Sequence, residues 1–409
     1  MSDILDLATM QSEDEELVPE ILSVDARLAI RGSVSAITQL FERAASVAPR
    51  KEIIEGTSFS LLETFSATSG TAAHTRITAT DGDQTITVTQ DGVQVLMEGV
   101  ALIPAKKVYD ILRLAPTDTV RIEVLGDSAL IRSGRAQWTV KTPPGDSLPS
   151  TANVDSIQRQ TVSRGPLLRA LQVARRAANS STTRPALQQV QIRNQTVTGL
   201  DGGRLHRAHL AGLHKDVQLD IPVKVVDELI RALGKSESEY VEIGGDNKNL
   251  VFQIDEDRLT AQRMLVPFPD VEGLLLKPAF SNTHSLTLPR QGLYDAVKRV
   301  RVNSDPDHAG IFLSLVKGTG ASEWAVSVRS RDKIGNTAQE VVEADWLGSL
   351  KAFELCVNHK HLMDLLECAT GEIIEFKLGK DTKQTKQPLY TESGELTAFV
   401  QQMRPDWLQ

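Results

Sequence analysis

The chain is poor in cysteine and in aromatic residues, and it contains no long apolar run. Its 409 residues include two cysteines, Cys356 and Cys368, too few to hold a chain of this size together by disulfides. Both lie among apolar neighbours and are expected to be small core residues. No stretch approaches the roughly 18 consecutive apolar residues of a membrane-spanning helix. The first ten residues contain no basic residue and no apolar block, so no targeting segment is predicted. We therefore expect a soluble, cytoplasmic protein without a membrane partner.

Basic residues are absent from the first 26 positions. This segment contains eight acidic residues and carries a charge of −8, which equals the net charge of the whole chain, so residues 27–409 are neutral. Polar, acidic segments of this kind do not bury enough apolar surface to fold. Residues 1–26 are therefore predicted to be an acidic, disordered tail.

Internal repeats divide the remaining chain into three similar parts. A chain of this length is expected to have more than one core. In each part an alternating strand pattern opens directly into a helix pattern. The three openings are Arg27–Arg31 before Ala36–Ala48, Gln160–Arg164 before Leu167–Ala178, and Ser285–Pro289 before Gly292–Val300.

A second helix pattern follows in each repeat, at Ile103–Leu112, Ile221–Ile230 and Val357–Leu366. Two further strand patterns follow each of these helices, with one polar face that favours antiparallel sheets. The predicted fold class is α+β, with three repeated domains at residues 27–148, 157–278 and 284–409. The paired strand patterns are Val120–Val124 with Ala129–Arg132, Tyr240–Ile243 with Leu250–Ile254, and Ile373–Leu378 with Leu396–Val400.

Positive charge is concentrated on the predicted helices. Counted with their flanking residues, the six helix regions carry +12 and the rest of the chain carries −20. A basic helical face suits a polyanion that is contacted through its phosphates without reading of bases. Sequence-specific binding is not expected, because no helix-turn-helix or zinc finger is visible and aromatic residues make up 4% of the chain.

Enzyme motifs are not supported by their surroundings. Gly234-Lys235-Ser236 resembles the end of a phosphate-binding loop, but the position of the required earlier glycine falls inside an apolar helix pattern. The histidines cluster without a cysteine or carboxylate at metal-ligand spacing, and they are expected to be surface or packing residues. No catalytic residue, metal site or cofactor is therefore predicted. The clusters are His206, His209 and His214, and His359 with His361.

Several motifs resemble the bacterial replicative sliding clamp, the beta subunit of DNA polymerase III. Order and spacing agree from about residue 27 to residue 404. The resembling segments are Ile103–Arg113 with its Pro-Ala-Lys-Lys start, Ile131–Arg135 with its Ser-Gly-Arg motif, Thr198–Leu205, Phe268–Asp270, Asn358–Asp364 and Met403-Arg404.

This resemblance implies a processivity factor rather than an enzyme. Two chains would form a homodimeric ring of six domains, with antiparallel sheets outside and helices lining a hole that encircles double-stranded DNA. The implied partners are duplex DNA without sequence preference, the alpha subunit of DNA polymerase III, the clamp loader and other proteins with a clamp-binding motif. The residues expected to approach DNA, by resemblance or by charge, are Arg50, Lys106, Arg175, Arg176, Lys224, Lys298 and Arg299.

Two protein contacts are also implied by the resemblance. The dimer interface would use Trp138 and Val140 of the first domain and Val302 and Asn303 of the third. A groove between the second and third domains would receive peptides of partner proteins. Its expected lining is Arg184, Leu187, Leu200, Gly202, Gly203, Arg204, Leu205, Leu276, Asn358, His361, Val400 and Met403.

Two other functions remain open from sequence. The groove departs from the family pattern at Gly203 and His361, and the acidic tail is an addition. Both features are compatible with an accessory or regulatory clamp paralogue that binds partners without supporting bulk replication. The other alternative is an enzyme that processes nucleic acid through a dispersed carboxylate pair.

Overall fold

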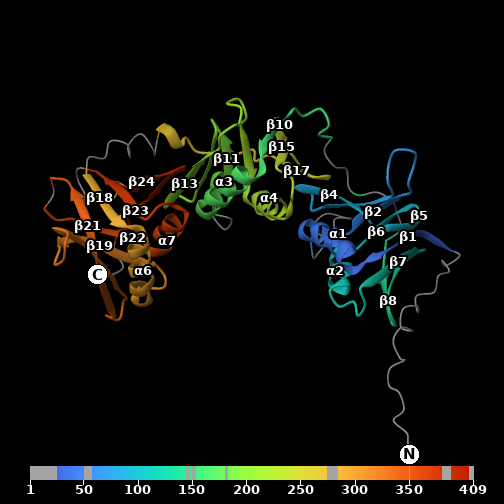
Figure 1. The fold of residues 1–409 in the computed structure, drawn as a ribbon, viewed down its shortest axis with the longest axis horizontal. Coiled ribbons are helices and arrows are strands. Elements are labelled where there is room, and N and C mark those ends of the chain that lie inside the picture. Colours follow the sequence, from blue (N-terminus) through green and yellow to red (C-terminus); the bar gives the residue numbers. More distant parts are fainter. Residues whose placement is uncertain are drawn as a thin grey trace, which may run out of the picture. The chain divides into compact units, whose positions relative to one another are not determined.

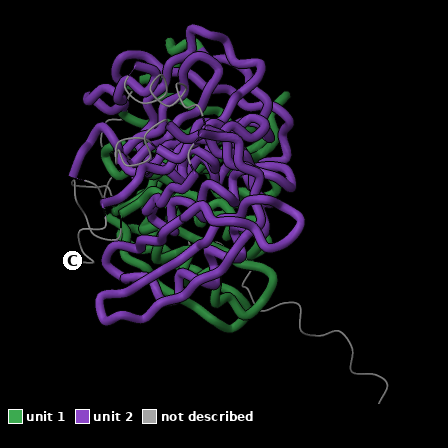
Figure 2. The backbone as a smooth tube through the Cα atoms, turned by 90° about the vertical axis from the view of Figure 1, so that its left-hand side faces the viewer, with its two compact units in different colours: residues 1–158, 249–262 green, residues 159–248, 263–409 purple. Residues whose placement is uncertain are grey.

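The computed structural model describes most of the chain after the acidic segment. The described residues are 25–49, 58–143, 148, 153–179, 183–273, 284–349, 351–379 and 388–404. Arg50, Leu276 and residues 1–24 of the predicted tail lie outside them. The chain forms two compact units, one of residues 1–158 with 249–262 and the other of residues 159–248 with 263–409 (Figure 2).

The first unit contains two antiparallel sheets and two helices. Helix α1 (Val34–Val47) packs against α2 (Ala105–Leu112). It also packs against two neighbouring strands of one sheet, β3 (His74–Thr80) and β4 (Gln84–Asp91). The first sheet has the strand order β5 (Gln94–Met97), β1 (Ala26–Ser33), β7 (Thr119–Leu125), β8 (Ser128–Ser133), β9 (Ala136–Lys141). In this unit the second sheet runs β16 (Asn249–Ile254), β17 (Asp257–Gln262), β4 (Gln84–Asp91), β3 (His74–Thr80), β2 (Ser60–Phe65), β6 (Gly99–Ile103).

The hairpin β16–β17 joins the first unit although it is remote in sequence. Strand β17 pairs with β4 from Arg258 opposite Thr87 to Ala261 opposite Gln84. Asp257 accepts a hydrogen bond from the backbone N–H of Thr89 at 3.0 Å and forms an ion pair with Arg43 of α1. This hairpin therefore extends the sheet of the first predicted domain.

The described residues of the second unit include four α-helices and two sheets. The helices are α3 (Arg164–Ala177), α4 (Val223–Lys235), α6 (Arg290–Val300) and α7 (His359–Cys368). Helix α3 packs against α4 and α7, and α6 packs against α7. In Figure 1, α3 and α7 lie on the same side of the strands. One sheet pairs β10 (Arg159–Ser163) with β15 (Tyr240–Gly245). The other has the order β14 (Leu219–Pro222), β11 (Gln189–Arg193), β12 (Thr196–Leu200), β13 (Arg204–His209), β25 (Leu396–Val400), β24 (Leu389–Ser393), β23 (Ile373–Leu378), β18 (His284–Pro289), β21 (Thr337–Leu347), β20 (Trp324–Arg331), β19 (Gly310–Lys317), β22 (Glu354–Asn358).

The predicted repeat elements are confirmed, with two corrections. All three strand–helix openings and all three second helices are present. The third strand pair was incomplete, because β24 lies between β23 and β25 in the sheet. The helices are also shorter than the charged regions counted around them, so that Arg113, Arg184 and Arg301 fall beyond their ends. The six helices alone therefore carry a net charge of +7.

Candidate nucleic-acid and protein interfaces

The predicted DNA-contacting residues that the structure describes are on helices, but three of the arginines form ion pairs. Arg175 donates two hydrogen bonds to the carboxylate of Asp227, at 2.6 and 3.0 Å. Arg176 pairs with Glu367, and Arg299 pairs with Glu340 at 2.5 and 2.8 Å. These contacts orient the guanidinium groups and offset part of their charge.

The predicted lysines differ in their exposure. Lys298 on α6 and Lys224 on α4 are exposed, and Lys106 on α2 is half-buried. Among the exposed basic residues on helices that were not singled out from sequence are Lys107 and Arg169. Helical spacing in the sequence could have identified both residues, because each lies between buried residues that recur at helical intervals.

The groove residues meet where the C-terminal segment crosses between the second and third repeats. Strand β13 pairs with β25 from Arg204 opposite Val400 to Ala208 opposite Leu396. Beyond β25, the N–H of Gln401 donates to the carbonyl of Gly203, and the N–H of Met403 donates to the carbonyl of Cys356, both at 2.8 Å. The C-terminal segment thus connects the β12–β13 turn to β22.

The apolar part of the predicted groove is buried. Leu187, Leu200 and Leu205 are at most 5% exposed, and they belong to one cluster with four other side chains. Sequence reasoning used Phe268 only as part of a linker motif and did not select the other three. The added members are Phe268, Val271, Tyr390 and Phe399.

The two glycines of the β12–β13 turn have separate structural reasons. Gly202 has a φ of +92°, which favours glycine. At Gly203 an added Cβ would lie 3.0 Å from Cε1 of His361, so the glycine leaves room for the imidazole. Burial lowers the pKa of His361, while the nearby Asp201 acts in the opposite direction. Asn358 caps α7, its side chain accepting hydrogen bonds from the N–H groups of Lys360 and His361.

An ion-pair network crosses the same junction. Arg204 donates to Asp201 at 2.9 Å within the turn and pairs with Asp364 on α7. Arg176 of α3 also reaches Asp364, at 3.6 Å. Since Arg204 is only 14% exposed, removing it would leave partly buried carboxylates without this partner, which costs more than breaking a surface pair.

Buried His206 and half-buried Cys368 complete the junction. His206 on β13 is fully buried, with Nδ1 3.2 Å from the carbonyl oxygen of Val173 and 3.8 Å from Sγ of Cys368. Burial lowers the pKa of His206 to about 3 and raises the pKa of Cys368 to about 11. Cys356 is also buried, and its pKa rises to about 12. These groups are packing residues, as predicted.

The predicted dimer residues lie at strand edges and beside them. Strand β9, with half-buried Trp138 and buried Val140, is the last strand of its sheet. After α6, Val302 is 80% exposed, and Asn303 donates through Nδ2 to the carbonyl of Thr337 at 2.9 Å. Thr337 begins β21, which pairs with β20 over residues 337–344 but with β18 only at residues 345–347.

The described residues form neither a metal site nor a phosphate-binding loop. Within the described part of the chain, no group of three or more His, Cys, Asp or Glu side chains is arranged to hold a metal ion. Gly234-Lys235 ends helix α4, so this motif does not form a phosphate loop. None of the described helices is long and apolar enough to span a bilayer.

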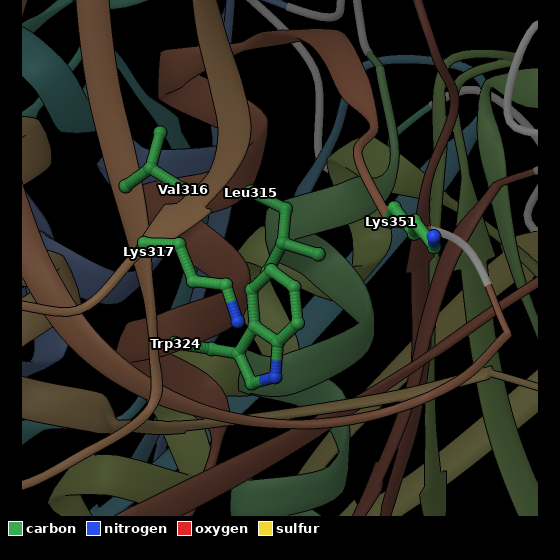
Figure 3. Close-up of a pocket in the computed structure, with 5 residues that line it drawn as sticks. All are labelled: Leu315, Val316, Lys317, Trp324 and Lys351. Carbon is green, nitrogen blue, oxygen red and sulfur yellow. The ribbon is translucent and has the colours of Figure 1, made fainter.

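A separate pocket on the third repeat was not foreseen. Its volume is about 410 Å³, and Lys317 Nζ lies 4.0 Å from the centroid of the Trp324 ring (Figure 3). The other lining residues are Leu315, Val316 and Lys351. Lys317 also pairs with Glu323 at 2.7 Å, so its charge is offset locally.

Bacterial clamps are among the known proteins that resemble this chain. Residues 68–152 match the family described as DNA polymerase III beta subunit, N-terminal domain. The Pseudomonas putida beta sliding clamp is 25% identical over 296 residues, covering 68% of this chain and 75% of the relative. The Caulobacter vibrioides beta sliding clamp is 24% identical over 321 residues, covering 75% of this chain and 83% of the relative.

Solved structures agree in fold over nearly the whole chain. The beta sliding clamp of C. crescentus aligns with a TM-score of 0.81 at 22% identity and covers 93% of this chain and 100% of its own. The DNA polymerase III beta subunit of Pseudomonas aeruginosa aligns with a TM-score of 0.79 at 21% identity, covering 92% and 100%. The fold is therefore that of the sliding clamps. Together with the sequence matches, it makes the chain similar to the bacterial beta clamps.

Proposed function

We propose that this protein is a DNA sliding clamp, a non-catalytic processivity factor that encircles duplex DNA. The observation that carries the proposal is the match of clamp fold and charge: six helices with a net charge of +7 in a chain whose total charge is −8. Diffuse attraction to phosphates has no preferred register, and it therefore permits sliding. Lys106, Lys224 and Lys298 would contribute directly, and Arg175, Arg176 and Arg299 through ion-paired guanidinium groups.

Ring closure would join the first domain of one chain to the third domain of its partner. Among the described strands, β9 has a neighbour on one side only, and the first half of β21 lacks a second neighbour. Such edges pair readily with another strand. Trp138 and Val140 would meet the partner's third domain beside Val302 and Asn303. A head-to-tail contact that closes on itself gives a homodimer.

The groove between the second and third domains would bind peptides of the polymerase alpha subunit, the clamp loader and other partners. Support comes from the convergence of Arg204, His361, Val400 and Met403 at the C-terminal segment. Because its apolar cluster is closed in this structure, a partner peptide would bind by displacing side chains. This closed cluster also favours the second candidate, an accessory clamp with a narrower set of partners. The three-domain division at 27–148, 157–278 and 284–409 belongs to the same proposal.

The first test is the mass in solution. The ring predicts twice the 44.7 kDa of one chain over a range of concentrations. A monomer at all concentrations, with no change when nicked circular DNA and a clamp loader are added, would contradict it. Complementation of a clamp-deficient strain would separate the main clamp from the accessory candidate.

A further inference from the structure

A short segment packs onto the apolar cluster at the junction of the second and third repeats. We call residues 268–272 the strap. Phe268 and Val271 of the strap are 8% and 4% exposed, and both belong to the buried cluster that lies where the peptide groove is predicted. The strap is therefore part of what keeps this cluster buried. The cluster members outside the strap are Leu187, Leu200, Leu205, Tyr390 and Phe399.

The strap also lines a pocket of about 500 Å³. Strand pairing places Gln191 opposite Thr198 and Thr198 opposite Arg207, so these three side chains share one face of the sheet. Because Phe268 and Val271 belong to both linings, the pocket and the apolar cluster have the strap as a common wall. The pocket residues outside the strap lie on β11, β12, β13 and the turn between β11 and β12, and they are Gln191, Arg193, Asn194, Thr196 and Arg207.

Opposite charges hold the strap to the sheet. Among the residues that line the pocket, the sheet contributes Arg193 and Arg207 and no carboxylate. The strap contributes Asp270 and Glu272 and no basic residue. Arg207 forms an ion pair with Glu272, and its Nε donates to Oγ1 of Thr198 at 3.0 Å. Since Arg207 is 15% exposed and Glu272 is 57% exposed, the arginine is fixed on the sheet and the glutamate is the partner that can leave.

An opened strap would leave Arg193 and Arg207 beside an uncovered apolar cluster. A carboxylate suits such a guanidinium group, because the two can form two parallel hydrogen bonds. We propose that the Arg207–Glu272 ion pair holds the strap closed, and that the strap opens for a partner peptide in which acidic residues flank apolar ones. An acidic residue then takes the place of Glu272, and apolar residues take the places of Phe268 and Val271. This inference rests on the proposed peptide groove and names the class of peptide that the groove admits.

Thiol labelling in the absence of any peptide tests the strap. Val271→Cys places a thiol in the closed strap, and mass spectrometry gives the labelling rate at position 271. Adding Glu272→Gln or Arg207→Gln should raise this rate about threefold in each case, as expected for a largely exposed ion pair. Adding Glu242→Gln, which breaks the exposed pair with Arg159, is the matched control and should leave the rate unchanged.

The two test variants change the charge beside the thiol in opposite directions. Loss of the arginine would by itself slow labelling, since a nearby positive charge favours the reactive thiolate. A faster rate in both variants therefore reports opening of the strap. An unchanged rate in both, or a rise with Glu272→Gln and a fall with Arg207→Gln, would overturn the proposal.

Binding of two peptides to the chain that keeps Val271 tests the class of partner. The probes are Glu-Glu-Leu-Leu-Phe-Glu-Glu and its counterpart with Gln in place of each Glu, both with blocked ends. The unaltered protein should bind the acidic probe about threefold more tightly than the neutral one, and Arg207→Gln should lose this preference. Glu272→Gln should bind the acidic probe about threefold more tightly than the unaltered protein does. Isothermal titration calorimetry measures all of these affinities.

The peptide results separate this inference from the groove on which it rests. A preference for the acidic probe that is unchanged in Arg207→Gln would overturn the acidic partner, although the groove would stand. Binding of neither probe to any variant would contradict the proposed groove together with the acidic partner. The labelling rates would then decide by themselves whether the ion pair holds the strap.

Discussion

The junction between the second and third repeats and the open strand edges differ in how completely their polar groups are paired. At the junction, β13 and β25 pair over five residues, and the C-terminal segment adds hydrogen bonds to Gly203 and Cys356. At the edges, β9 has one neighbour and β21 is only partly covered. The junction is therefore a permanent connection, whereas the edges are suited to a contact that forms and opens between chains.

The largest expected effect is at the edge beside β21. Val302→Asp should weaken dimer formation at least a hundredfold, because a charge would be buried at the interface without a partner. The fold should be unaffected, since Val302 is 80% exposed in one chain. Leu265→Asp, at a leucine that is 92% exposed in the second repeat, is the control. Sedimentation across a concentration series measures both; equal dimerisation of the two variants would remove Val302 from the interface.

At the junction, Arg204→Ala should lower the free energy of unfolding by about 2 kcal/mol, because Asp201 and Asp364 lose a partly buried partner. Arg159→Ala breaks the more exposed pair with Glu242 and should cost about 0.5 kcal/mol or less. Urea denaturation gives both values. Similar losses in the two variants would mean that the junction network is no stronger than a surface pair.

The junction should also weaken in acid through His206. The pKa of this histidine is about 3 in the folded chain, against an ordinary 6.5, so the unfolded chain binds the proton first as the pH falls. Its contribution to stability is complete above pH 6.5 and is lost between pH 6.5 and 3, at about 1.4 kcal/mol per pH unit. His206→Asn should flatten the fall in urea midpoint between pH 7.5 and 5.5, and His214→Asn at an exposed position should not.

The smallest expected effect is on the basic helices, which belong to neither region. Lys298→Gln should reduce the salt dependence of DNA binding by about one phosphate contact while leaving dimerisation and unfolding unchanged. Fluorescence anisotropy with duplex DNA at several salt concentrations measures this slope. An unchanged slope would place Lys298 away from the DNA.

The sequence predicted repeated elements better than pairings between them. Strand–helix openings were visible because alternation and helical spacing are local patterns. Strand β24 was missed since Leu389–Ser393 is short and separated from β23 by a long connection. The ion pairs of Arg175, Arg176 and Arg299 could not be predicted, because their partners lie 41 to 191 residues away.

The groove shows the same limit. Its turn and capping residues were found through motifs, including Gly202, Gly203 and Asn358. The closure of its apolar cluster by Tyr390 and Phe399 depends on the pairing of β24 with β25, which only the folded chain shows. Sequence motifs therefore predict a groove at this junction without giving its shape.

Retention on DNA of different topology tests the central claim most directly. The protein is loaded by a clamp loader onto a nicked circle, and the complex is passed through a sizing column at a salt concentration that removes ordinary phosphate binding. A clamp should remain with the circle and be released when a single cut makes the DNA linear. Equal retention on circular and linear DNA, or release from both by a protein that is dimeric and folded, would contradict the account.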